Sequence, residues 1–400
     1  MNRRIYLDYG ASTPLDKRIF AAMGPYFSTK YGNAGSSHFF GQEASAAIFK
    51  ARLVIAKVIG AKNDEIIFTG SATEANNLVL RGAIKAAIRR GVKIPHIITS
   101  AFEHPSILAT CRDLQADGVE VTYLPVTRDG FVDLEALEQA LKENTVLVSA
   151  MYVNNEVGTI QPIFKISEII QEFKTSHISH LTSNFSKIYP LFHSDAVQAF
   201  QYLDCDVNKL GVDLMTISAH KIYGPKGIGA LCIRNSKLKN SKTILSPIIT
   251  GGGQEPRGLN SGTPNTPYIV GFGEAVLINE KIKDKEAARV EALRDYAWRA
   301  IQKSVPKARL NGSRENRIEN NINVYFPGRR AHELMIKLDL AGVAVSSGVA
   351  CSARAVIPSI TLMAMGLGEK RATESLRMTL GRPTTKNEID YLVKQLALLK

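Results

Sequence analysis

A lysine that directly follows an apolar strand pattern is the first residue of this sequence with an evident chemical use. Leu214–Ser218 has the character of a buried strand, His220 and Lys221 follow it, and a Tyr-Gly-Pro-Lys-Gly turn comes next. A lone lysine in such a place is usually solvated. An amine held at the mouth of a sheet, away from bulk water, has a lowered pKa and can form a Schiff base with an aldehyde. We therefore predict covalent chemistry at Lys221.

A carboxylate lies where it would complete such a site. Asp195 ends the strand pattern that precedes the lysine strand, and Gln198 follows three residues later. Pyridoxal phosphate (PLP) needs a carboxylate against its pyridine nitrogen, because the protonated ring is the electron sink. Asp195 would supply that carboxylate and Gln198 would donate to the ring oxygen. Taken alone, Asp195 would more commonly be a helix N-cap.

Groups suited to a phosphate and to a flat ring occur elsewhere in the chain. Phe68–Glu74 has the pattern of a strand, a glycine turn and a helix start, and Ala72 and Thr73 open that helix. Helix N-termini bind anions, although an ordinary capping box has a similar sequence. Thr263 offers a second hydroxyl from a loop, and the ring of His104 could stack on an aromatic cofactor. In isolation, His104 would be taken for a structural histidine of the core.

The elements that must position these residues alternate between strands and helices. Seven short apolar segments have strand character: Glu65–Thr69, His96–Ser100, Glu120–Leu124, Thr145–Tyr152, Phe192–Asp195, Leu214–Ser218 and Ile228–Ile233. Helical apolar spacing covers the segments Gln42–Ile59, Glu74–Arg90, Ser106–Asp117, Leu134–Leu141 and Ile166–Phe173. This pattern predicts an open, largely parallel α/β sheet covered on both faces, with its active site beyond the carboxyl ends of the strands.

A second, smaller unit follows a glycine-rich turn near residue 251. A long helical pattern covers Gly273–Lys303, and the segments Asn320–Phe326, Val343–Ser346 and Glu374–Leu380 have strand character. A length of 400 residues also favours two domains. We expect residues 16–265 to form a large cofactor-binding domain, and residues 1–15 with 266–400 to form a small domain.

Composition excludes several classes of protein. The net charge of +13 is spread along the chain without an aromatic platform or a nucleic-acid motif, which predicts a basic surface and no direct nucleic-acid binding. The sequence contains no run of about 18 apolar residues, so we predict no membrane span. The first residues enter a strand pattern at once and leave no room for a signal peptide. We expect a cytoplasmic protein, with the mature form of an organellar matrix protein as the alternative.

The four cysteines include one in an unusual setting. Cys111, Cys205, Cys232 and Cys351 form no Cys-x-x-Cys pair, which predicts a reducing compartment and no disulfide framework. Cys351 alone lies among small residues, in Val345–Ala355. The paired histidines 177 and 180 have no further ligand beside them, so we predict no metal site.

Together these motifs give the sequence a family resemblance. The chain resembles the NifS/IscS cysteine desulfurases, which have PLP fold type I and belong to the class V aminotransferase superfamily, from Ile5 to Arg382. The closest agreement is in Ser71–Asn76, Val153–Gly158, Asp195–Gln198, Ser218–Gly227, Gly251–Glu255 and Ser346–Ser352. The resemblance implies a large domain with a mostly parallel seven-stranded sheet, a smaller α/β domain that carries the catalytic cysteine loop, and PLP as the cofactor.

The same resemblance implies roles for individual residues. Lys221, Cys351 and His104 are expected to be catalytic. Expected cofactor contacts comprise Lys221, Asp195, Gln198, Asn155, the stacking ring of His104, and a phosphate cup of Ala72, Thr73, Ser218 and His220. Thr263 is expected to reach the phosphate site of the other subunit, which implies a homodimer. Asn33, Asn155 and Arg377 are expected to bind the substrate carboxylate.

The implied reaction converts L-cysteine into L-alanine. The thiolate of Cys351 would attack the substrate sulfur, and the resulting persulfide would pass to an acceptor such as an iron–sulfur scaffold or a tRNA-thiolation protein. A related PLP enzyme, either a selenocysteine lyase or a class V aminotransferase, is the first alternative. A catalytically slow paralogue that acts as an assembly subunit is the second.

The sequence departs from the family pattern at several places. These are the Gly70-Ser71 order, Ala34 after Asn33, an inserted Pro256, Asn260 in place of a basic residue, a long Thr175–Pro190 stretch, and an end at Lys400 without an extended tail. We expect these differences to affect partner docking and efficiency more than the reaction itself.

Overall fold

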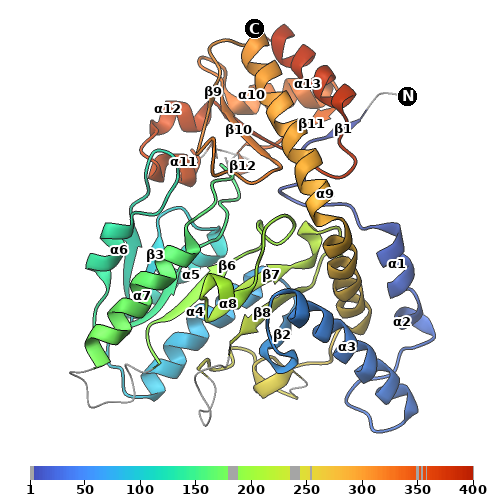
Figure 1. Cartoon of the computed structure of the whole chain (residues 1–400), viewed down its shortest axis with the longest axis vertical. Helices are drawn as coiled ribbons and strands as arrows, with labels where there is room; N and C mark the ends of the chain where they lie inside the picture. Colours follow the sequence, from blue (N-terminus) through green and yellow to red (C-terminus); the bar gives the residue numbers. More distant parts are fainter. Residues whose placement is uncertain are drawn as a thin grey trace.

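The computed structural model describes residues 4–178, 188–234, 244–252, 255–347, 351–352, 355–356 and 358–399; for residues 177, 178, 351, 352, 355 and 356 it describes only the backbone. The molecule has a broad part built around one large sheet and a smaller part above it, joined by a long helix (Figure 1). This arrangement confirms the predicted α/β fold with one large and one small unit.

The large sheet has the seven predicted strands. Their order across the sheet is β2 (Ile66–Thr69), β8 (Gly229–Ile233), β7 (Leu214–Ser218), β6 (Leu191–Asp195), β5 (Thr145–Ser149), β3 (His96–Ser100) and β4 (Glu120–Leu124). β8 runs opposite to the other six strands of this sheet, which all point the same way. All the strands are buried along their length except β4, at the edge of the sheet, where most residues are half-buried. Burial on both faces explains the nearly continuous apolar runs in the sequence.

Helices cover both faces of this sheet. One face carries α4 (Ala72–Arg89) and α5 (Pro105–Ala116), whose apolar residues pack with Ile67, Ile97 and Leu147. The other face carries α3 (Phe39–Val58), α6 (Leu134–Ala140), α7 (Ile163–Ile178) and part of α9 (Thr266–Ser304). Successive strand residues point to opposite faces, so Ile97 and Ile98 belong to different cores. Three short helices complete this part: α1 (Lys17–Met23), α2 (Pro25–Ser28) and α8 (Val207–Leu210).

The smaller part contains an antiparallel sheet and a short parallel pair. The sheet has the order β14 (Ser375–Thr379), β10 (Asn321–Tyr325), β9 (Arg309–Leu310). Near the N-terminus, β1 (Ile5–Tyr6) pairs in parallel with β11 (Val343–Ala344). The helices of this part are α10 (Ala331–Leu340), α11 (Ile360–Ala364), α12 (Gly368–Thr373) and α13 (Lys386–Leu398). The start of the chain therefore lies beside its last third, although the domain boundaries themselves stay a prediction.

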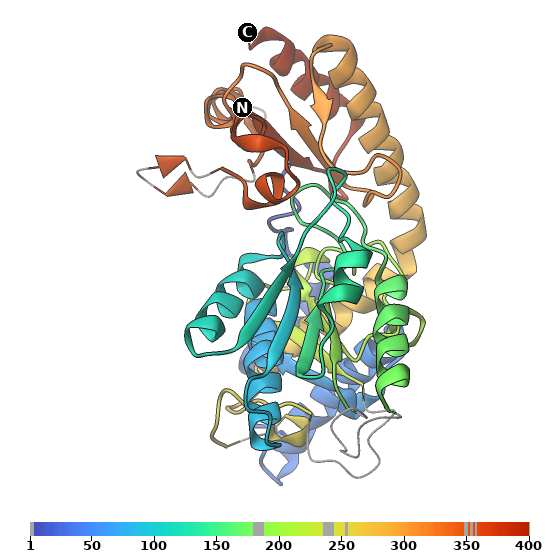
Figure 2. The same ribbon diagram turned by 90° about the vertical axis from the view of Figure 1, so that its left-hand side faces the viewer.

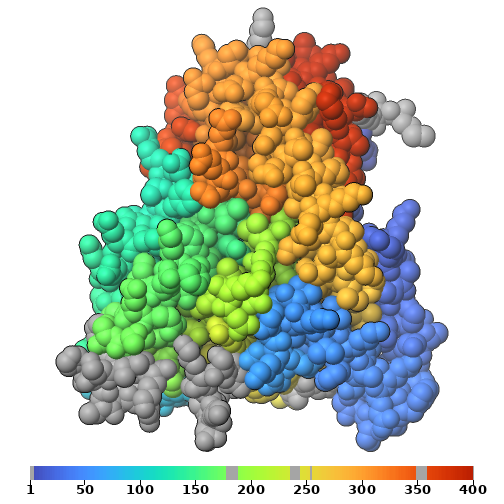
Figure 3. Space-filling view, viewed as in Figure 1, coloured from blue at the N-terminus to red at the C-terminus, as the bar shows by residue number. Residues whose placement is uncertain are grey.

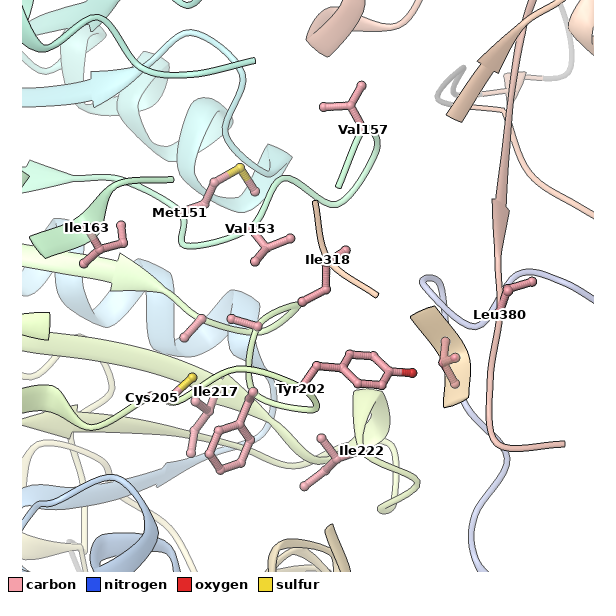
Figure 4. Packing of buried hydrophobic residues seen from close by; sticks show 14 of the residues in the cluster. Met151, Val153, Val157, Ile163, Tyr202, Cys205, Ile217, Ile222, Ile318 and Leu380 are labelled. Atoms are coloured by element: carbon pink, nitrogen blue, oxygen red, sulfur yellow. The ribbon is translucent and has the colours of Figure 1, made fainter. Parts of the chain in front are cut away.

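The two parts share one apolar core. Met151, Val153 and Ile222 from the sheet side belong to the same buried cluster as Ile318 and Leu380 from the smaller part, as Figure 4 shows. In the space-filling view, the orange atoms of the smaller part lie directly against green atoms of the sheet part (Figure 3). This continuous packing fixes the position of β14 relative to the large sheet.

Two short strands of the smaller part extend away from this core. β12 (Cys351–Ser352) and β13 (Ala355–Val356) pair with each other in antiparallel fashion. Figure 2 shows them, in orange-red, projecting to one side of the molecule. The thiol of Cys351 lies outside the described residues, which include only the backbone of this amino acid.

Several predicted boundaries differ from those observed. The strand predicted to reach Tyr152 ends at Ser149, because the chain then turns to make an isolated bridge between Val153 and Ile160. The long helix begins at Thr266, before Gly273, since the side chain of Asn265 caps it and a proline occupies its first turn. In each case a local hydrogen bond, which apolar spacing does not report, sets the boundary.

None of the described helices is both long and apolar enough to cross a lipid bilayer. No group of three His, Cys, Asp or Glu side chains within the described ranges is placed to hold a metal ion. Of the two histidines considered for a metal, residue 180 and the side chain of residue 177 lie outside those ranges.

Candidate active site

A cavity of about 550 Å³ opens where β6 and β7 end. Ten of the predicted site residues line it: Ala72, Thr73, His104, Asn155, Asp195, Gln198, Ser218, His220, Lys221 and Arg377. These residues come from segments spread over 300 positions of the chain. As expected for an open parallel sheet, the carboxyl ends of neighbouring strands bring most of them together.

Lys221 enters this cavity from a short turn after β7. The turn is the 3₁₀ helix η2 (Ala219–Lys221). The lysine Nζ donates to the backbone carbonyls of Gly10, at 2.6 Å, and Ala11, at 2.8 Å. Burial, followed by the nearby Arg377 charge, lowers the pKa of Lys221 to about 8. A useful fraction of this amine is therefore neutral, and so nucleophilic, near neutral pH.

Asp195 is held by a chain of polar side chains at the end of β6. Its Oδ2 accepts from Asn76 Nδ2 at 2.8 Å, and its Oδ1 accepts from the backbone N–H of Val197 at 3.0 Å. The same Asn76 nitrogen donates to Ser106 Oγ at 2.9 Å. These bonds fix the orientation of a carboxylate that is only 7% exposed.

The hydrogen bonds that hold Asp195 extend through Ser106 to His104, whose ring is neutral. Its Nδ1 accepts from the backbone N–H of Ser106 at 3.1 Å and lies 2.8 Å from Ser106 Oγ. Because Nδ1 accepts, the ring proton belongs on Nε2. Burial lowers the pKa of His104, and the Lys221 charge lowers it further while Asp195 opposes both. The cavity therefore contains an uncharged ring as well as the Asp195 carboxylate.

The first turn of α4 lines the cavity next to Ser218 and His220. Ser71 caps this helix, since its Oγ accepts from the backbone N–H of Glu74 at 3.1 Å. The first N–H groups of a helix have no intrahelical partner and attract anions. A side chain at Gly229 of β8 would lie 2.9 Å from the Ala72 nitrogen, so only glycine allows the strand to approach this turn. The arrangement can bind a phosphate.

Arg377 reaches the cavity from β14 of the smaller sheet. Its Nη2 donates to Asp8 Oδ1 at 2.9 Å, and its Nη1 donates to the backbone carbonyl of Asn155 at 3.1 Å. The buried Nε has no hydrogen-bond partner among the described residues. An arginine fork held in this way is suited to bind a carboxylate.

Two predicted residues lie outside the cavity. Thr263 is exposed and lines a separate cavity of about 250 Å³ with Glu74 and Asn260. Asn33 is also exposed, and its Oδ1 accepts from the backbone N–H of Gly35. Within one chain, neither is brought together with Lys221.

Several residues that depart from the family pattern make local hydrogen bonds or turns. The Gly70 nitrogen donates to Glu74 Oε2 at 3.0 Å, and Asn260 Nδ2 donates to Glu74 Oε1 at 2.8 Å. Pro256 begins the 3₁₀ turn η3 (Pro256–Gly258). Residues 179–187 of the long stretch before β6 lie outside the described residues.

Sequence reasoning assigned no role to several residues that the structure adds to the site. Gly10, Ala11, Asn76, Ser106 and Asp8 all bond directly to predicted site residues. For Asn76 a signal existed, because a polar residue interrupts the buried face formed by Ala75, Leu78 and Val79. Nothing in the sequence pattern of the N-terminal segment connects it to Lys221.

These groups fit pyridoxal phosphate. The cavity places an amine of lowered pKa, a fixed carboxylate, a neutral ring and a helix N-terminus around one space. The buried Oδ1 of Asn76, beside Asp195, also has no donor among the described residues. The donor set has each kind of partner that the cofactor's aldehyde, ring nitrogen, ring face and phosphate require.

Comparison with known proteins agrees with this site. The model of the class-V aminotransferase family matches residues 5–392. The chain is 45% identical over 391 residues to the cysteine desulfurase IscS of Dictyoglomus turgidum, which covers 98% of this chain and 93% of that protein. It also superimposes on a NifS-like protein with a TM-score of 0.87 and 35% identity, over 99% of each chain.

A further solved structure, of SspA in complex with cysteine, matches with a TM-score of 0.78 and 36% identity, over 94% of this chain and 98% of that one. The matches span nearly the whole length, so they apply to both parts of the fold. The chain therefore belongs to the class-V aminotransferase family and, within it, to the PLP-dependent cysteine desulfurases.

Proposed function

We propose that Lys221 holds PLP in the 550 Å³ cavity, that L-cysteine binds beside it, and that Cys351 receives the substrate's sulfur. The observation that carries this proposal is the Lys221 amine. Lys221 is half-buried, its pKa is lowered to about 8, and it shares one cavity with the fixed carboxylate of Asp195. The complex of the similar protein SspA with cysteine supports L-cysteine as the substrate.

The cofactor would have a defined set of protein partners. Asp195 would bond to the ring nitrogen, His104 would lie against the ring, and Gln198 and Asn155 would lie on the side of the ring oxygen. The phosphate would bind at Ala72, Thr73, Ser218 and His220. When bound, the cofactor withdraws electrons from the substrate and so weakens its C–S bond.

The residues of the chain would then complete the transfer. Arg377 would bind the substrate carboxylate, and Lys221 would move protons as a neutral amine once substrate replaces it at the cofactor. The Cys351 thiolate would attack the substrate Sγ, forming an S–S bond while the C–S bond breaks and its electron pair goes to carbon. Protonation of that carbon gives L-alanine. The overall change is L-cysteine plus the Cys351 thiol to L-alanine plus a Cys351 persulfide.

A second copy of the chain would complete each site. Thr263 is exposed and lies outside the cavity of its own chain, as expected if it serves the partner. The helices α1 to α3 and the loops beside them also expose an unusual set of large apolar side chains: Phe20, Phe27, Tyr31, Phe39, Phe40, Phe49 and Leu53. Concentrated apolar exposure of this kind is typical of an interface.

Mixed dimers test this arrangement. If Thr263 acts on the partner's site, a heterodimer of Lys221→Ala and Thr263→Ala chains contains one site with both wild-type residues. Mixing two weakly active variants would then restore activity. If Thr263 acts within its own chain, both sites of the heterodimer carry a substitution and mixing restores nothing.

The persulfide would leave on an acceptor protein such as an iron–sulfur scaffold or a tRNA-thiolation protein. The strands β12 and β13, which include the Cys351 backbone, project from the molecule and would be accessible to it (Figure 2). Free thiols at Cys111, Cys205 and Cys232 suit the reducing environment of the cytoplasm.

A product assay tests the reaction. Purified protein with PLP and L-cysteine should yield L-alanine, and a single turnover without reductant should leave one persulfide on Cys351. Cys351→Ser should keep the visible absorption band of the cofactor and lose both products. Unchanged turnover in this variant would contradict the proposed sulfur transfer, and turnover that requires a keto acid would indicate an aminotransferase.

A further inference from the structure

The N-terminal segment before α1 wraps around the turn that carries Lys221. Its Gly10 and Ala11 carbonyls accept from the lysine Nζ, and the Gly10 carbonyl also accepts from Gln198 Nε2 at 3.0 Å. Farther along the segment, the backbone N–H of Asp16 donates to the carbonyl of Tyr223 at 3.0 Å. The lysine is thus held from outside the sheet on which its turn is built.

Thr13 lies at the centre of this contact. Its Oγ1 donates to the His220 carbonyl at 2.9 Å and accepts from the Tyr223 N–H at 2.8 Å. Its own backbone N–H donates to the same His220 carbonyl at 3.1 Å. A hydroxyl group can donate and accept at once, so a single oxygen bonds to the carbonyl of the residue before Lys221 and to the N–H of the second residue after it.

The turn needs such support because its backbone is strained. Tyr223 has a φ of 67°, in the left-handed region that residues other than glycine seldom adopt. It is 3% exposed, and its hydroxyl accepts from the Arg382 N–H at 2.6 Å. Strained residues of this kind persist only when their surroundings hold them. The contacts that hold Tyr223 come from the N-terminal segment and from the segment that follows β14.

We propose that Thr13 is a positioning residue for the cofactor lysine, because its hydroxyl bridges the His220 carbonyl and the Tyr223 N–H, on either side of Lys221 and Ile222, and so fixes how the lysine side chain enters the cavity. This inference rests on the proposed role of Lys221. Thr13 is 2% exposed and is absent from the cavity lining, so it acts through the turn and without touching the cofactor. Removing the hydroxyl leaves the Tyr223 N–H and part of the His220 carbonyl without a partner. The turn would relax, and the lysine would be misplaced.

The test is the rate at which the cofactor attaches to cofactor-free protein. Thr13→Val removes the hydroxyl at nearly constant volume, and we expect the visible band to form about tenfold more slowly, which corresponds to about 1.4 kcal/mol. The pH midpoint of that band should also shift. In the steady state, kcat should fall while KM for L-cysteine changes by less than about twofold, because Arg377 is untouched. Thr13→Ser keeps the hydroxyl and should restore the wild-type rate.

Thr145→Val is the matched control. Thr145 is 1% exposed, and its hydroxyl accepts from the Lys142 N–H and contacts His96, so this variant also loses the two hydrogen bonds of a buried hydroxyl. It lies at the first residue of β5, at the end of the sheet opposite the cavity. We expect it to lower thermal stability and to leave cofactor attachment unchanged.

The outcomes separate this inference from the function on which it rests. Borohydride reduction followed by peptide mass spectrometry should find the cofactor on Lys221 of the wild type, and its absence there would overturn the proposed function. If the label is on Lys221 but Thr13→Val attaches cofactor at the wild-type rate, or Thr145→Val is slowed equally, only the role of Thr13 fails. Should Thr13→Val not fold, Thr13→Ala replaces it, and equal rates for the alanine and serine variants would overturn the inference.

Discussion

The two walls of the cavity are built in different ways. On one wall, Asp195 ends β6, His104 follows β3 and Lys221 follows β7, and Asn76 and Ser106 link Asp195 to His104 by hydrogen bonds. The other wall joins Arg377 of β14 to the N-terminal segment through the ion pair with Asp8, 369 positions away in the chain. The first wall is a product of local strand order, and the second exists only when the two ends of the chain meet.

This difference suggests that the two walls have different functions. The sheet wall presents neutral or fixed groups, since burial lowers the pKa of His104 and Lys221 and hydrogen bonds orient Asp195. The other wall presents a guanidinium whose partner, Asp8, is a carboxylate of the kind that a substrate would bring. We infer that the sheet wall controls the chemistry and that the other wall controls substrate binding.

A substitution at Asp195 is expected to have the largest effect on catalysis and so tests the role of the sheet wall most directly. Asp195→Asn keeps the shape but removes the negative charge that would hold a protonated ring nitrogen, so we expect kcat to fall by roughly 10²- to 10³-fold. KM for L-cysteine should change little. Steady-state alanine formation measures both, with Asp117→Asn on the exposed end of α5 as the control. A rise in KM at constant kcat would place Asp195 on the substrate side instead.

Arg377→Lys tests the wall that contains Arg377 and its role in substrate binding. Lysine keeps the charge but loses the planar fork, so we expect KM for L-cysteine to rise by roughly tenfold with a smaller change in kcat. The intensity of the cofactor band should stay at the wild-type level. Loss of that band would mean that Arg377 supports the cofactor and that the two walls are not separate in function.

The pH dependence of cofactor attachment tests the protonation of Lys221 in the sheet wall. Only the neutral amine of Lys221 attacks the aldehyde, and its pKa is lowered to about 8. We therefore expect the attachment rate to rise by about tenfold per pH unit below pH 8 and to level off above it. Stopped-flow absorbance on cofactor-free protein measures this profile. A rate that is flat from about pH 6.5 to 8 would contradict the expected protonation of the lysine.

The smallest effect is expected at Glu103, behind the sheet wall. Burial raises the pKa of this carboxyl to about 8, and its Oε2 has no hydrogen-bond partner among the described residues. The folded state therefore keeps a proton that the unfolded chain loses above its ordinary pKa. As a result, the free energy of unfolding falls as the pH rises from about 4.5 towards 8.

Glu103→Gln should remove this dependence. The amide resembles the protonated acid and can still accept from Ser100 Oγ and the Met151 N–H. We expect the variant to be more stable than the wild type by about 1–3 kcal/mol at pH 8.5 and nearly equal to it at pH 4.5. Thermal unfolding across this range is the measurement, and parallel curves for the two proteins would show that Glu103 does not titrate there.

Much of the sheet wall could be predicted from the sequence. The strand that carries Asp195 and the strand that precedes the Lys221 turn end within one residue of their predicted positions. Apolar runs bounded by polar residues indicate where a buried strand ends, and parallel strands then bring those ends to one edge. The residue pattern also suggested His104, and the family resemblance added Asn155 and Arg377; all three line the cavity.

The sequence by itself determined where the buried strands lie along the chain and which residue types end them, because both depend on neighbours along the chain. The tertiary structure alone decided that Thr13 bridges the turn at Lys221 and that Asp8 faces Arg377. Those contacts arise when β1 pairs with β11 and the shared apolar core closes, which sets distances between residues hundreds of positions apart. No local pattern reports such contacts, since their free energy depends on the packing of the whole molecule.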